Sequence, residues 1–176
     1  MTSELNNFTC WLRANRLSLN VAKTEQMIIG PRQRLNAQCE EIEISIDDRT
    51  INRVDHTESL GLTFDGQLSW SKHVDEICKK ASSAIRALKR VRTFIPTDVT
   101  AQIYSTLMLP HFDYCSPVWD YMSAYSSDKL QKLQNRAARV ITKSPFDTSS
   151  NLLLTMLKRE KLSLRRKKNP ENFNYL

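Results

Sequence analysis

The sequence contains little glycine, and its cysteines are few and widely separated. Only three glycines occur in 176 residues, which disfavours an all-β sandwich and favours helix as the main secondary structure. The four cysteines form no Cys-x-x-Cys pair, and none of the histidines lies three to five residues from another. Without these spacings neither a zinc site nor a disulfide framework is expected, so no metal is predicted and the thiols are predicted to be reduced.

Long apolar runs and catalytic signatures are missing as well. No segment approaches the roughly 20 apolar residues that a membrane span requires. The amino end, MTSELNNF, has neither the basic start nor the apolar stretch of a signal peptide. We therefore expect an intracellular protein, in the cytoplasm or the nucleus, without a membrane partner. Gly-rich phosphate loops and the H-E-x-x-H and G-x-S-x-G motifs do not occur.

Positive charge is plentiful, and it belongs to the second part of the chain. The net charge of the whole chain is +7. Residues 1–66 carry 7 Lys and Arg against 10 Asp and Glu, a balance of −3, whereas residues 67–176 carry 19 against 9, a balance of +10. A positive field of this size attracts the phosphates of nucleic acids, or else an acidic protein surface.

The first part is predicted to combine one helix with short strands. Apolar residues recur three and four positions apart between residues 5 and 12, behind Ser3, which predicts an amphipathic helix that ends near residues 13–15. The segments EQMIIG, IEISI, INRV and TESLGLTF (57–64) each have the composition of a single strand. The adjacent Asp47 and Asp48 are assigned to a turn and not to a metal site, because neighbouring strand residues point to opposite faces.

From residue 69 the spacing of apolar residues becomes helical. The apolar positions between Trp70 and Val91 fall on one face of a long predicted helix, while Lys72, Lys79 and Lys89 lie largely on other faces. A second helix is predicted from Pro96 to a stop at Pro110, and the segment HFDYCSPVWDYM is predicted to be a packed connection. A third helix is predicted to open at Ser127. The fold class is thus predicted to be α+β and mostly helical, with parts at 1–66 and 67–145 and a leucine-rich basic tail at 146–176 whose end is frayed.

Basic residues repeat along the third predicted helix. The intervals are 3, 4, 3 and 4, which places five cations on one face: Lys129, Lys132, Arg136, Arg139 and Lys143. The tail adds a run of four: Arg165, Arg166, Lys167 and Lys168. We take these residues as candidate nucleic-acid contacts, with a solvated helix face as an equally good interpretation of the stripe. Five aromatic residues could stack on unpaired bases: Trp70, Trp119, Tyr114, Tyr121 and Tyr125. For both Trp70 and Trp119 a place in the core is the better interpretation.

The segment W-L-R-A-N-R-L-S-L-N-V-A-K-T-E (11–25) resembles the late palm segment of reverse transcriptases from non-LTR retrotransposons of the jockey and LINE kind. Seven positions match in order and spacing: Trp11, Asn15, Leu17, Leu19, Asn20, Lys23 and Thr24. The segment E-S-L-G-L-T-F-D (58–65) resembles the primer grip of these enzymes, centred on Leu60 and Gly61. Later segments, including L-Q-N-R-A-A-R-V-I-T (133–142), resemble the helical thumb that follows.

The resemblance implies a C-terminal piece of an RNA-directed DNA polymerase, with residues 1–66 as the remnant of the palm. In that family the metal-binding aspartates precede the tryptophan segment, so this chain is expected to lack them, to hold no cofactor and to be inactive alone; magnesium would act in the intact enzyme. The family gives Lys23 a role in assisting the leaving pyrophosphate. Expected partners are RNA or DNA, bound without sequence preference, and the missing upstream polymerase region. The alternative is a non-enzymatic helical module that docks on an acidic protein.

Overall fold

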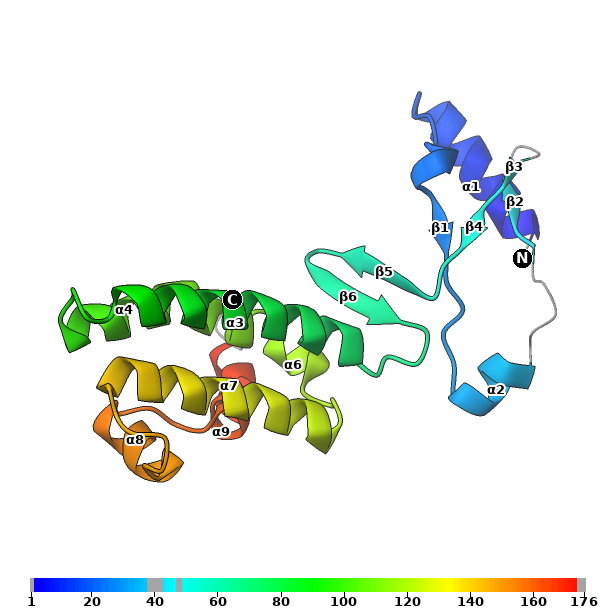
Figure 1. Cartoon of the computed structure of the whole chain (residues 1–176). Coiled ribbons are helices and arrows are strands. Elements are labelled where there is room, and N and C mark those ends of the chain that lie inside the picture. The colour runs from blue at the N-terminus through cyan, green and yellow to red at the C-terminus, as the bar shows by residue number, and fades with distance from the viewer. Residues whose placement is uncertain (1, 38–42, 47–48, 174–176) are drawn as a thin grey trace. The chain divides into compact units, whose positions relative to one another are not determined.

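The fold is known from a computed structural model, which describes residues 2–37, 43–46 and 49–173 (Figure 1). It is α+β and mostly helical, which confirms the class expected from the composition. The chain divides into two compact units, Met1–Ser69 and Trp70–Leu176. Among the described residues no helix is long and apolar enough to cross a membrane.

The first unit contains short elements around a small core. In chain order they are α1 (Thr2–Ala14), the 3₁₀ turn η1 (Val21–Lys23), β1 (Glu25–Gln26), α2 (Arg32–Ala37), β2 (Ser45–Ile46), β3 (Arg49–Thr50), β4 (Asn52–Arg53), β5 (His56–Ser59) and β6 (Leu62–Asp65). In the described part the strands pair two by two: β1 with β4 in parallel, and β2 with β3 and β5 with β6 antiparallel. Helix α1 confirms the predicted amphipathic helix, and its Leu12 is buried along with Ile46 of β2.

The prediction of one strand over 57–64 is wrong, because the chain reverses within it. Strands β5 and β6 pair with Ser59 opposite Leu62, which leaves Leu60 and Gly61 as a two-residue loop. Their φ angles are 50° and 76°, and positive φ at both central residues identifies the type I′ turn that suits a hairpin. The glycine permits this turn. The turn is nevertheless hard to recognise in the sequence, because Asn or Asp usually occupies the position of Leu60. The predicted turn at Asp47 and Asp48 lies outside the described residues.

The second unit is a bundle of helices. Its elements are α3 (Ser71–Val91), α4 (Thr97–Leu107), α5 (Leu109–Asp113), α6 (Ser116–Trp119), α7 (Ala124–Thr142), α8 (Ser150–Met156) and α9 (Leu162–Phe173). The two long helices α3 and α7 pack side by side, with α8 and α9 against α7 (Figure 1). Val74, Ala81 and Ile85 of α3 are completely buried, as are Leu130 and Ala137 of α7, so each helix turns its apolar stripe inward.

The helix boundaries differ from the predicted ones at two prolines and one serine. Pro110 does not end the second helix; it lies in the first turn of α5, where the missing N–H costs nothing. Pro117 occupies the same position in α6, so the expected connection is largely helical. Helix α7 begins at Ala124, before the predicted start, because the side chain of Ser123 caps it by accepting a hydrogen bond from the backbone N–H of Ser126 at 3.2 Å.

Two arginines of α9 hold the tail to the bundle. The guanidinium of Arg165 donates two hydrogen bonds to the carboxylate of Asp113, at 2.7 and 2.6 Å. Arg166 is buried, with its side chain 3% exposed, and donates to Asp120 at 2.7 Å and to Ser127 at 2.8 Å. Its guanidinium also lies 5.8 Å from the ring centre of Trp119. Both arginines therefore act as internal ties of the second unit.

Candidate nucleic-acid interface

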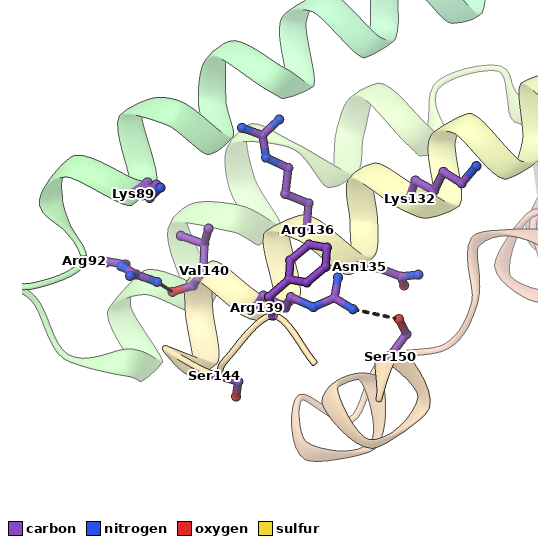
Figure 2. A pocket seen from close by; sticks show the side chains of 10 residues that line it. Lys89, Arg92, Lys132, Asn135, Arg136, Arg139, Val140, Ser144 and Ser150 are labelled. Atoms are coloured by element: carbon purple, nitrogen blue, oxygen red, sulfur yellow. Dashed lines mark hydrogen bonds between the residues drawn. The ribbon is translucent and has the colours of Figure 1, made fainter. Parts of the chain in front are cut away.

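A groove of about 580 Å³ opens on the second unit, between the end of α3, the middle of α7 and the segment that joins α7 to α8 (Figure 2). Ten residues line it: Lys89, Arg92, Lys132, Asn135, Arg136, Arg139, Val140, Ser144, Phe146 and Ser150. We call it the basic groove. Five of its lining residues are cations and none is an aspartate or glutamate, so an anion that enters meets attraction from both helices.

Two of the five cations shape the groove. Arg92, just after α3, donates a hydrogen bond from Nη1 to the backbone oxygen of Val140 at 3.5 Å. Arg139 donates from Nη2 to the backbone oxygen of Thr148 at 3.3 Å and to Oγ of Ser150 at 3.4 Å (Figure 2). The first contact joins α3 to α7 and the second fixes the segment before α8. These guanidinium groups hold the walls of the groove while contributing positive charge to it.

The other three cations, Lys89, Lys132 and Arg136, are exposed. Lys132 pairs with Asp128, one turn earlier on α7, at 2.7 Å, which raises the pKa of the lysine through the hydrogen bond to the carboxylate. The two side chains are 75% and 59% exposed, so this ion pair is weak and easily exchanged for a phosphate. In the described part of the chain, Lys89 and Arg136 have no ion pair or side-chain hydrogen bond. These three side chains are available to a ligand.

The helical period explains how α7 presents its part of this surface. Lys132, Arg136 and Arg139 are separated by four and three residues, so they project from one side of the helix. Lys89 and Arg92 repeat the same spacing in the last turn of α3 and just beyond it. The sequence places Lys89 only on a face away from the core, and its apolar pattern does not single out Arg92. The three-residue spacing of Lys89 and Arg92 indicates that they lie on one side of the helix end. Only the packing of α3 on α7 brings them close to the cations of α7.

The structure separates the predicted cationic stripe. Lys129 forms an ion pair with Asp75 of α3 and lines a different hollow with Cys78, Lys79 and Arg86. Lys143 ends α7 in a left-handed conformation, with φ of 56°, and does not line the basic groove.

The basic run in the tail is also divided. Arg165 and Arg166 pair with Asp113 and Asp120, and Lys168 pairs with Glu160 at 2.6 Å. Lys167 is exposed. We therefore leave the two arginines out of the proposed interface, since a phosphate would have to displace the carboxylates with which they already pair.

The remaining candidate residues belong to the first unit. Lys23 is the exposed last residue of η1, and Leu60 and Gly61 form the tip of the β5–β6 hairpin, where Leu60 is 86% exposed. The described residues contain no group of three His, Cys, Asp or Glu side chains that could hold a metal ion. They therefore do not fit the carboxylate set that a two-magnesium polymerase site requires.

One comparison with known proteins bears on this surface. A curated protein of Drosophila melanogaster, described as a probable RNA-directed DNA polymerase from transposon X-element, is 22% identical to this chain over 138 residues. The similarity supports a reverse-transcriptase-like origin. Because the match covers 77% of this chain, it necessarily includes α3, whichever end it leaves out. The chain spans only 15% of the length of that polymerase. No family profile and no solved structure matches the chain.

Proposed function

We propose that this chain is the late-palm and thumb-like part of a reverse-transcriptase-like protein, and that its basic groove binds the sugar-phosphate backbone of RNA or DNA without sequence preference. The observation that carries the proposal is the groove itself, which five cations line without one carboxylate. Phosphate contacts position a nucleic acid but carry no sequence information. The similarity to a transposon polymerase supports this choice over other anionic ligands.

A direct binding measurement tests the proposal. The anisotropy of fluorescent RNA and DNA oligonucleotides is followed while the full chain is added, at several salt concentrations. Affinity should fall steeply and linearly on a plot of log affinity against log salt, with little difference between oligonucleotides of unrelated sequence. Equal affinity for poly-glutamate at matched charge would favour the alternative, a helical module that docks on an acidic protein.

We further propose that the chain alone adds no nucleotides. The sequence contains no tyrosine followed by the paired aspartates of the polymerase motif, and the magnesium-binding carboxylates would come from the upstream region of an intact polymerase. In that assembly Lys23 would assist the leaving pyrophosphate, and Leu60 and Gly61 would contact the primer. Incubation with a primed RNA template, deoxynucleotides and magnesium should give no extension; extension that a chelator abolishes would refute this proposal.

A further inference from the structure

Phe146 is an aromatic side chain in an unusual place, because it lines the basic groove and is nevertheless 89% exposed. It belongs to the segment between α7 and α8. A phenylalanine stabilises a fold mainly through the burial of its side chain. Phe146 is too exposed to contribute much stability in this way. Exposed aromatic rings beside cations are the arrangement by which proteins bind unpaired bases, since the ring stacks on a base while the cations hold the phosphates.

We propose that Phe146 is a stacking platform for one unpaired base, and that the basic groove consequently prefers single-stranded nucleic acid to a duplex. The proposal rests on the proposed function and deepens it by naming the form of nucleic acid that the groove takes. Lys89, Lys132 and Arg136 would contact the phosphates on either side of the stacked nucleotide. In a duplex the bases are already stacked on their neighbours and offer no free face to the ring.

The ring is held in position by an arginine that is itself anchored. The guanidinium of Arg139 lies 5.4 Å from the centre of the Phe146 ring. The same guanidinium donates hydrogen bonds to Thr148 and Ser150, on the far side of Phe146 in the chain. This contact restricts the ring on one side, so the ring loses less freedom when a base stacks on it than a ring without such a neighbour would.

The size and lining of the groove agree with a short stretch of unpaired chain. A volume of about 580 Å³ lies within the usual range for sites of small organic ligands. Asn135 and Ser144 add an amide and a hydroxyl to the lining. The Asn135 side-chain oxygen already accepts a hydrogen bond from Gln131 at 2.9 Å, so its amide N–H groups remain as donors to a base or a ribose.

Other exposed aromatic rings of the second unit lack these surroundings. Tyr121 and Tyr125 are both highly exposed, but neither lines the basic groove. Phe94 is 86% exposed, nearly the same as Phe146, and it too does not line the groove. Phe94 therefore provides a matched control for the effect of removing an exposed phenylalanine.

The experiment measures the affinity of the full chain for three probes of equal length: a single-stranded oligonucleotide, the same backbone with abasic sites, and a duplex. Phe146→Ala should weaken binding of the single strand by about 5- to 150-fold, the range found when one stacked base is lost. It should leave binding of the abasic strand unchanged and should not alter the salt slope. Phe146→Trp should restore the affinity, Phe146→Leu should not, and Phe94→Ala should behave as the wild type.

Three outcomes overturn the proposal. If the wild-type chain binds single strand and duplex with a steep salt dependence but Phe146→Ala binds the single strand as the wild type does, stacking is refuted and the proposed function stands. If the wild-type chain binds none of the three probes at low salt, both the stacking role of Phe146 and the proposed function are refuted. Equal losses for the abasic and the normal strand would also refute stacking. Circular dichroism melting curves of the variants establish that each is folded.

Discussion

When Lys89, Lys132 and Arg136 are all replaced with Gln, the affinity for nucleic acid should lose most of the salt dependence that the basic groove contributes. All three side chains are exposed and line the groove. Among the described residues, their replacement breaks one ion pair, between Lys132 and Asp128, and both of these side chains are exposed. Gln is almost as good a helix former as Lys or Arg. The variant should therefore fold as the wild type does. Arg139 is left in place, because its hydrogen bonds to Thr148 and Ser150 shape the groove.

The size of the effect follows from counterion release. Each phosphate contact that is lost should flatten the plot of log affinity against log salt by roughly 0.7 units for a single strand or 0.9 for a duplex. Three contacts amount to about 2 to 3 units. Between 50 and 200 mM salt, the affinity of the wild type should then fall about 20- to 40-fold more than that of the variant.

A control variant with the same change in net charge distinguishes a site from a general field. Lys72, Lys80 and Lys161 are exposed residues of the second unit that do not line the basic groove. Their triple replacement with Gln should flatten the salt plot by clearly less than the groove variant does. Equal flattening by the two variants would refute the groove as a binding site and leave only the overall positive charge of the unit at work. Thermal melting of both variants should match the wild type.

Three further predictions concern stability. Arg166→Met should lower the free energy of unfolding by about 3 kcal/mol, because it leaves Asp120 without its buried partner; thermal unfolding measures this, and Lys167→Met, which changes an exposed neighbour, should alter it by less than about 0.5 kcal/mol. Leu60→Asn should slow amide hydrogen exchange in β5 and β6 about fivefold, since Asn tolerates the positive φ of the turn and roughly 1 kcal/mol of strain is relieved; faster exchange would contradict the type I′ turn. Burial raises the pKa of Tyr104 from 10.0 to about 12, so above pH 10 the unfolded chain loses this proton while the folded chain keeps it. The free energy of unfolding should therefore fall by about 2 to 3 kcal/mol between pH 10 and pH 12. Urea titrations of the wild type should show this loss, and Tyr104→Phe should largely remove it.

Local sequence patterns were sufficient to predict the long elements of this protein. The helical period of apolar residues predicted α1, α3 and α7, because a helix that buries one face must repeat its apolar residues every three or four positions. Trp70 and Trp119 were expected in the core on a different ground, that most aromatic side chains are buried, and the structure confirms this. Shorter elements were predicted poorly. The sequence does not predict the β5–β6 hairpin, because its turn carries Leu60 where the usual signal is Asn or Asp. It does not predict helix α5 either, because Pro110 indicates a helix end but lies in the first turn of this helix.

The sequence by itself also determined where the positive charge lies along the chain and that several cations share one side of α7. It could not determine which cations of the second unit are free and which are paired. Lys129, Arg165 and Arg166 pair with carboxylates of other elements, at Asp75, Asp113 and Asp120. Such pairs depend on contacts between residues up to 54 positions apart, which no local period encodes. The basic groove has the same origin, since the packing of α3 on α7 places Lys89 and Arg92 opposite Arg136 and Arg139, and periodicity within one helix carries no information about which helix lies beside it.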